Sequence, residues 1–202
     1  NGFNITIAQA LLHSTIPGDG ANDGGLTVQG AGTLTLTGQL GYRGTTTVAN
    51  GSLILGDATN SVTLPGDLSL TGGNFALSNG SLGNGTVTTN GNALVIGLIA
   101  NTRATAGSAT INNTGTVAFQ NSGDGGTALI NNAGLVDFAD MSNAAGATIN
   151  NSGGGLLQFR INSSAGNATI VNGAGTSTTF GGNSTAANAT ITSLPGALLT
   201  FQ

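Results

Sequence analysis

Three charged residues in the second half of the chain have the types that glycan-cleaving chemistry requires. Asp137 and Asp140 lie on either side of Phe138, and Arg160 follows Phe159 one repeat later. A polysaccharide lyase or hydrolase uses paired carboxylates, or carboxylates that hold Ca²⁺ beside a basic residue. The same residues can instead form a surface ion pair, which contributes about 0–1 kcal/mol to stability. We expect the ion pair, no enzymatic activity and no cofactor.

Other candidates for catalysis or metal binding are few. His13 is the only histidine, so one imidazole is available for any catalytic or metal site, and we expect it to be structural or solvated. The segment 19–24 is rich in oxygen ligands, but it lacks a ligand at the third position and an acidic residue at the twelfth. The sequence therefore predicts a polar turn there and no Ca²⁺ site. The absence of cysteine removes disulfides and thiolate chemistry.

The charge content excludes several classes of partner. Only 5% of residues are charged, the net charge is -4, and the three cations are Arg43, Arg103 and Arg160. Nucleic acid is not an expected partner, because no basic stripe is present to neutralise phosphates. The longest apolar run, residues 93–100, is far shorter than the ~20 residues that a membrane helix needs, so no membrane span is expected in this chain.

The second half of the chain is a series of repeated units, each with an Ala-x-Ile segment followed by one phenylalanine. The isoleucines are Ile111, Ile130, Ile149, Ile170 and Ile191, and the phenylalanines are Phe119, Phe138, Phe159, Phe180 and Phe201. Each phenylalanine precedes the next isoleucine by 11 residues, whereas the step from isoleucine to phenylalanine lengthens from 8 to 10 at a Gly-rich turn. Length variation confined to one corner is typical of a solenoid. We expect both sets of side chains to form inward columns.

Asparagine recurs just after the isoleucines. Asn113, Asn132, Asn151 and Asn172 would lie above one another in stacked coils. Their amides would then form a ladder along the stack at a corner. Alternatively, these asparagines serve left-handed turn conformations, and the two roles are compatible.

The first half consists of short alternating strands separated by Gly or Asn. No segment is long enough for a crossover helix, so parallel strands must be connected as a coil. The side-chain period of two excludes helix. We predict an all-β parallel β-helix (β-solenoid) of about ten coils, in one domain over residues 1–202.

One apolar run breaks the alternation. If one face of residues 93–100 packs inward, Leu94, Ile96 or Leu98 would be left outward as a contact patch. Alternatively, this strand is covered by a loop or buried where the two repeat types meet.

Part of the first half resembles a known repeat. Residues 32–38, 42–48 and 51–56, in that order and spacing, resemble the passenger-associated transport repeat of bacterial autotransporters. The later Ala-Thr-Ile-Asn-Asn units (101–202) are similar to stalk repeats of large passengers and follow the transport-repeat-like coils (1–100). The resemblance implies a right-handed parallel β-helix, exported by a Gram-negative bacterium and displayed on, or released from, its outer surface.

The expected function is a non-catalytic extracellular structural or adhesive solenoid, with a host or cell-surface ligand that the sequence does not identify. The alternating segment Asn4–Ile7 and the final Phe201 leave both ends without a recognisable cap. The alternative function is therefore the subunit of a filament built by end-to-end stacking. A glycan-processing enzyme is the least favoured interpretation.

Overall fold

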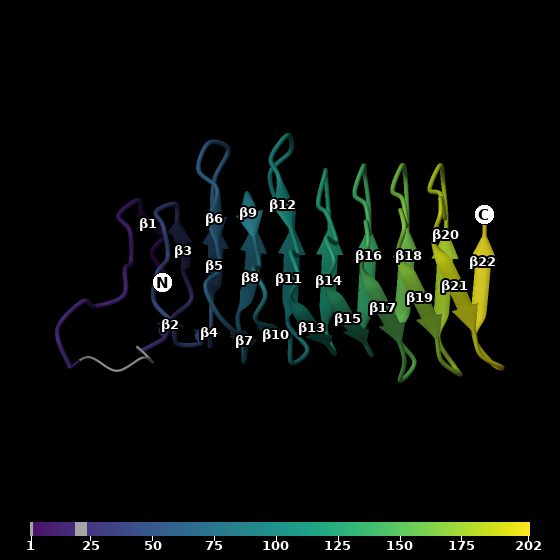
Figure 1. The fold of residues 1–202 in the computed structure, drawn as a ribbon, viewed down its shortest axis with the longest axis horizontal. Coiled ribbons are helices and arrows are strands. Elements are labelled where there is room, and N and C mark those ends of the chain that lie inside the picture. The colour runs from purple at the N-terminus through teal and green to yellow at the C-terminus, as the bar shows by residue number, and fades with distance from the viewer. Residues whose placement is uncertain (1, 19–23) are drawn as a thin grey trace.

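The chain forms a parallel β-solenoid of about eight turns in the computed structural model, which describes residues 2–18 and 24–202. These residues contain strands and turns and no helix. The strands stack along the long axis from the N-terminal to the C-terminal end (Figure 1). The predicted all-β solenoid is confirmed, and its longest sheet has ten strands.

Three parallel sheets form the faces of the solenoid. The ten-stranded sheet consists of β1 (Ile5–Ile7), β3 (Thr33–Leu36), β5 (Ser52–Leu55), β8 (Asn74–Leu77), β11 (Ala93–Ile96), β14 (Thr116–Phe119), β16 (Leu135–Phe138), β18 (Leu156–Phe159), β20 (Ser177–Phe180) and β22 (Leu198–Phe201). The nine-stranded sheet consists of β2 (Leu26–Val28), β4 (Thr46–Val48), β7 (Leu68–Leu70), β10 (Thr86–Thr88), β13 (Thr110–Asn113), β15 (Leu129–Asn132), β17 (Thr148–Asn151), β19 (Thr169–Asn172) and β21 (Thr190–Ser193). The short third sheet consists of β6 (Val62–Thr63), β9 (Gly80–Ser81) and β12 (Ala104–Thr105).

The alternation of the sequence sets which side chains enter the core. In β5 the side chains of Leu53 and Leu55 are fully buried, whereas Ile54 between them faces outward and is half-buried. The next strand of the sheet places Phe75 against Leu53 in register. Because apolar side chains stack on apolar side chains in successive coils, the core is one continuous hydrophobic cluster between the sheets.

Close contact between coils restricts side chains at some corners. Gly80 in β9 has a φ of 123°, and a Cβ at this position would lie 2.0 Å from the carbonyl oxygen of Val62. Only glycine fits both the backbone conformation and the space. The third sheet therefore depends on this residue for its first strand pairing.

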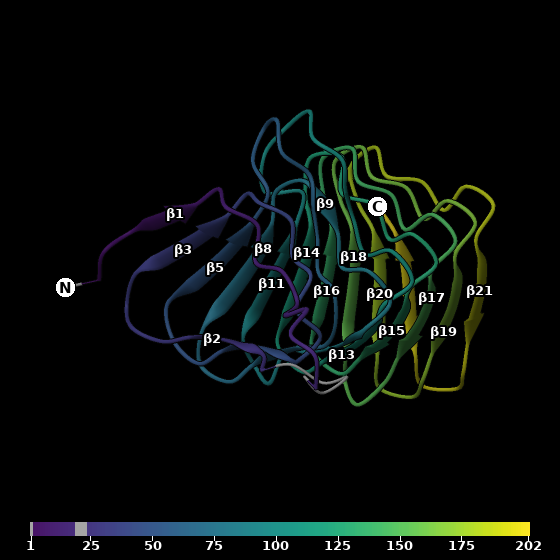
Figure 2. The same ribbon diagram turned by 60° about the vertical axis from the view of Figure 1, so that its left-hand side comes forward.

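The regularity of the stack differs between the two halves. Loops at residues 56–61 and 97–103 project from the stack beside β6 and β12 (Figure 1). From β13 onward the connections from the ten-stranded to the nine-stranded sheet repeat closely, and strands of the two long sheets alternate along the chain (Figure 2). Within residues 2–18 and 24–202, no helix is long and apolar enough to cross a membrane.

Candidate functional site

The five repeated phenylalanines lie in one column on the inner face of the ten-stranded sheet. The strand register pairs Phe119 with Phe138, and each later phenylalanine pairs with the next. Their ring centroids are 4.2–4.9 Å apart and their planes lie within 7° of parallel. The first four are buried, while Phe201 in the last strand is 62% exposed. The separation matches the ~4.8 Å strand spacing, so the backbone imposes the stacking.

The repeated isoleucines form a second column on the nine-stranded sheet. Ile111 pairs with Ile130, and the register continues through Ile149 and Ile170 to Ile191. The first four are fully buried and Ile191 is half-buried in the last coil. Variation in turn length leaves both columns in register, because the longer turns protrude at one corner.

The four repeated asparagines form a ladder in the interior, where all four are at most 1% exposed. The amide nitrogen of Asn113 donates to Oδ1 of Asn132 at 2.8 Å, and Asn132 donates to Asn151 at the same distance. Asn151 donates to Asn172 at 3.3 Å. None of the four has a positive φ, so the left-handed turn alternative is wrong for these residues.

The inner ladder satisfies every polar atom of its central member. Besides bonding the two neighbouring asparagines, Asn132 donates to the carbonyl oxygen of Leu156 at 2.9 Å and accepts from the backbone N–H of Gly134 at 3.1 Å. Buried amides with full partner sets specify one register of the coils, because any slip would leave donors and acceptors unpaired.

A second ladder, which was not predicted from the sequence, lies on the outside of the same strands. Asn131 donates to Asn112 at 2.9 Å, and Asn150 donates to Asn131 at 3.1 Å. These residues are the first of each Asn-Asn pair, and they face outward because successive side chains of a strand alternate. The signal that could have revealed this ladder is the repeated Asn-Asn pair itself.

A third column was also not predicted, and it lies at the corner that continues the third sheet. Parallel bridges connect Thr105, Asp124, Asn143, Ser164 and Thr185 in successive coils. Each side-chain oxygen accepts the backbone N–H two residues later, at 2.5–3.0 Å. The signal was a Ser, Thr, Asn or Asp two residues before Gly or Ala, repeated once per coil.

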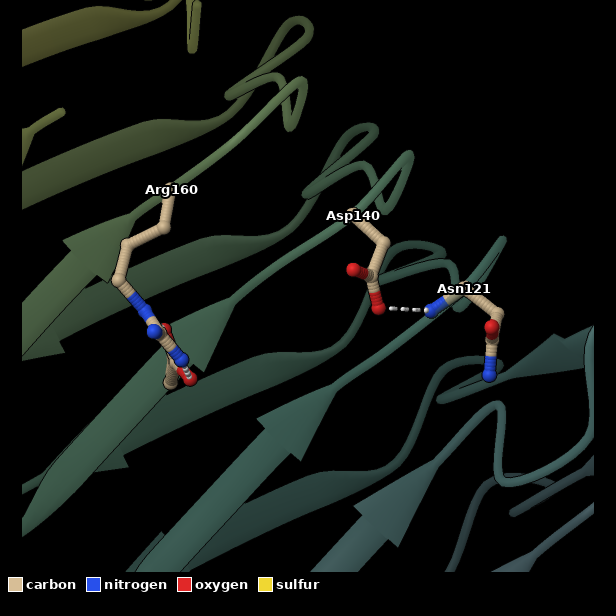
Figure 3. Close-up of polar contacts among 4 residues, drawn as sticks. Asn121, Asp140 and Arg160 are labelled. Atoms are coloured by element: carbon tan, nitrogen blue, oxygen red, sulfur yellow. Dashed lines mark hydrogen bonds and ion pairs between the residues drawn. The ribbon is translucent and has the colours of Figure 1, made fainter. Parts of the chain in front are cut away.

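The charged residues that suggested glycan chemistry take separate partners. Arg160 forms an ion pair with Asp137 through both carboxylate oxygens, with 2.8 Å between Nε and Oδ1 (Figure 3). This hydrogen bond and the charge of Asp137 raise the pKa of Arg160. Asp140 instead accepts the backbone N–H of Asn121 at 3.1 Å (Figure 3). The predicted ion pair therefore forms, and each carboxylate is directed at its own partner.

Metal-binding groups do not gather in the part of the chain that the structure describes: no cluster of three or more His, Asp or Glu side chains could hold an ion there. The oxygen-rich stretch at 19–24 lies, except for Gly24, outside the described residues. His13 is half-buried in the segment that follows Leu11.

The apolar run of β11 corrects one prediction. Leu94 and Ile96 are fully buried, because they pair with Phe75 and Leu77 on one side and with Val117 and Phe119 on the other. The outward contact patch is therefore wrong for these two residues. Val95 faces outward instead, and Leu98, in the following loop, is 39% exposed.

Comparison with known proteins gives no family assignment: no family model, curated protein or solved structure matches this chain. The molecule is defined by its fold as a β-solenoid. Its interior contains stacked columns, and the outer face of the nine-stranded sheet carries rows of mostly short polar side chains. Such rows provide hydrogen-bonding surfaces that repeat once per coil.

Proposed function

We propose that this chain is a non-catalytic structural and adhesive solenoid of an autotransporter-like surface protein, exposed outside a Gram-negative cell. The observation that carries the proposal is the unbroken parallel register of ten strands, with one phenylalanine column and one buried amide ladder along the later coils. A chain organised in this way provides length and stiffness.

Stiffness follows from how each coil is held. Backbone hydrogen bonds join every coil to its neighbours on both long sheets, and the hydrogen bond from Asn132 to Asn151 joins two successive coils inside the solenoid. Bending the stack would require bonds on one face to break, and buried amides that lose a partner cost about 1–3 kcal/mol each. A surface protein uses such a stack to hold other parts away from the cell.

The arrangement of charges supports a non-catalytic role. The carboxylate of Asp137 is bound by Arg160, and that of Asp140 by a backbone N–H. A panel of bacterial and host glycans incubated with the purified chain is expected to remain intact. Degradation that is lost in Asp137→Asn and Asp140→Asn would contradict the non-catalytic role.

Surface display is tested in the bacterium that encodes the full-length protein. Antibodies raised against the purified chain should label intact cells, or the culture medium should contain the released protein. Labelling that requires permeabilised cells would overturn the extracellular assignment, and a periplasmic marker protein serves as the control for cell integrity.

End-to-end assembly into a filament is the second candidate function. The observation that favours it is the constant register of the two columns, in which each isoleucine and each phenylalanine pairs with its equivalent in the next coil. A second copy whose coils continued this register would extend both columns. Electron microscopy separates the candidates: filaments that disappear in Phe201→Asp support assembly, whereas dispersed single rods support the first proposal, a rigid spacer that does not assemble.

A further inference from the structure

The outer face of the nine-stranded sheet carries two parallel rows of short uncharged side chains between β10 and β21. The first row, joined strand to strand by the register, is Thr86, Thr110, Leu129, Thr148, Thr169 and Thr190. The second row is Thr88, Asn112, Asn131, Asn150, Val171 and Thr192. We call these twelve residues the Thr/Asn array, and most of them are threonine.

The array has a fixed two-dimensional spacing. Successive residues in a row are separated by the strand spacing of ~4.8 Å, and the two rows lie about two residues, or roughly 6.6 Å, apart along each strand. The buried bond between Asn113 and Asn132 holds the same strands from behind, so the register of the outer rows cannot slip without breaking the inner ladder.

The side chains of the array are also restricted in their own torsions. Threonine is branched at Cβ, which restricts χ1. The side-chain amides of Asn112, Asn131 and Asn150 are joined by hydrogen bonds of 2.9 and 3.1 Å. Hydroxyls, methyls and amides therefore lie at repeating positions before any ligand arrives, and little side-chain entropy remains to be lost on binding.

The chemistry of the array excludes several partner classes. A protein interface is usually anchored by Trp, Tyr or Arg, and nucleic acid requires Lys or Arg, but the array has no aromatic and no charged residue. The opposite face is different, because Gln158 and the ion pair of Arg160 with Asp137 place long side chains on the ten-stranded sheet. An uncharged periodic surface matches a ligand that is itself periodic and uncharged.

We propose that the Thr/Asn array binds ice. The repeat along the stack is close to the repeat of water oxygens along one axis of hexagonal ice. Threonine hydroxyls can hydrogen-bond water while their methyl groups limit its other orientations, so water on the array is held in rows that match the crystal. Binding requires many similar positions at once, and ten of the twelve array positions on the six strands carry threonine or asparagine.

The test compares substitutions on the two outer faces. The purified chain should adsorb to a growing ice surface and lower the freezing point below the melting point. Thr148→Tyr with Thr169→Tyr places two large side chains in the middle of the array and should reduce this thermal hysteresis at least tenfold. The control Thr179→Tyr, on the outer face of β20, should leave it unchanged. Circular dichroism establishes that all variants are folded.

Two results would overturn the proposal. The first is that the unmodified chain neither adsorbs to ice nor shows thermal hysteresis. This result would overturn the proposal even if the chain bound an insoluble crystalline polysaccharide instead. The other is an equal effect of the array variant and the control. Neither result bears on the proposed rigid spacer, because that proposal does not depend on the array and is tested by the shape of the molecule.

Discussion

Asn113 and Asn132 are joined across two successive coils by an amide hydrogen bond of 2.8 Å in the interior of the solenoid. The side chains of both are at most 1% exposed, so water cannot replace this bond. Like residues stacked in a parallel coil can bond one another in this way because the strand spacing matches the reach of an amide. The interior is therefore specified by polar groups as well as by packing.

Removing one member of the inner ladder should be costly. Asn132→Ala leaves the amide of Asn113, the N–H of Gly134 and the carbonyl oxygen of Leu156 without their side-chain partner. We expect the free energy of unfolding to fall by about 3 kcal/mol or more, measured by urea denaturation. The control Asn131→Ala, on the outer ladder, should change it by about 0.5 kcal/mol or less. Equal losses would contradict a structural role for the inner ladder.

The phenylalanine column predicts a position-dependent cost. Phe138 is fully buried between two rings, with centroid separations of 4.2 and 4.9 Å. Phe138→Ala should lower the free energy of unfolding by about 3–5 kcal/mol. Phe201→Ala, at a residue 62% exposed and stacked on one side only, should cost less than about 1.5 kcal/mol in the dispersed chain. Thermal and urea unfolding of the two variants would show whether burial in the column is what matters.

Ala145 occupies a corner where neighbouring coils have glycine. Its φ is 54°, and the equivalent Gly126 and Gly166 have φ values of 59° and 61°. A left-handed conformation costs a non-glycine residue about 1–2 kcal/mol, whereas glycine loses about 0.5–1 kcal/mol more backbone entropy than alanine on folding. Ala145→Gly should therefore stabilise the chain by about 0.5–1 kcal/mol.

The matched control for this corner is Ala133→Gly, at an exposed alanine that is not in the left-handed region. It should destabilise the chain, since only the entropic cost of glycine remains. The account of the corner is wrong if both substitutions shift the unfolding midpoint in the same direction.

The regular parts of this fold could be predicted from sequence because its contacts are between like residues at a fixed interval. The constant step of 11 residues, such as that from Phe138 to Ile149, was enough to predict both columns. The corner position expected for the asparagines is confirmed, because Asn132 is the last residue of β15 and accepts the N–H of Gly134 in the turn before β16. Asn132 follows Ile130 by two residues and so shares its inward face, which the alternation already implied.

Which residues of the apolar run 93–100 face inward could not be predicted from the run itself. Leu94, Val95 and Ile96 are all apolar, so alternation does not show which of their side chains face the core. Pairing with Phe75 and Phe119 in neighbouring coils places Leu94 and Ile96 inside. The corner column from Thr105 to Thr185 was equally hidden, because its members share a hydrogen-bonding role and not a residue type. Side chains that act through one oxygen leave a weak repeat in the sequence.

Acid should destabilise the loop after β5 as the pH falls from about 4 to about 2. Hydrogen bonds from the side chain of Asn60, and then from the backbone of Asn60 and Thr59, lower the pKa of the exposed Asp57 carboxylate from 3.8 to about 2. Since the folded pKa lies below the unfolded one, the carboxylate stabilises this loop above about pH 4 and the stabilisation is lost as the pH falls towards 2.

A carboxyl-carbon NMR titration measures this pKa directly, and Asp57→Asn should flatten the dependence of stability on pH between about 4 and 2. A midpoint near 3.8 in the folded chain would show that the hydrogen bonds of the loop are absent in solution.

The most direct test of the rigid spacer is a distance along its length. The sequence has no cysteine, so Thr35→Cys with Thr179→Cys provides two unique spin-label sites, both facing outward on the ten-stranded sheet. Seven strand spacings separate them, which is roughly 34 Å at the cross-strand repeat. We expect pulsed electron–electron double resonance to give one narrow distribution of label-to-label distances centred near this separation, broadened only by the label linkers. A broad distribution, or several separated maxima, would contradict a rigid stack.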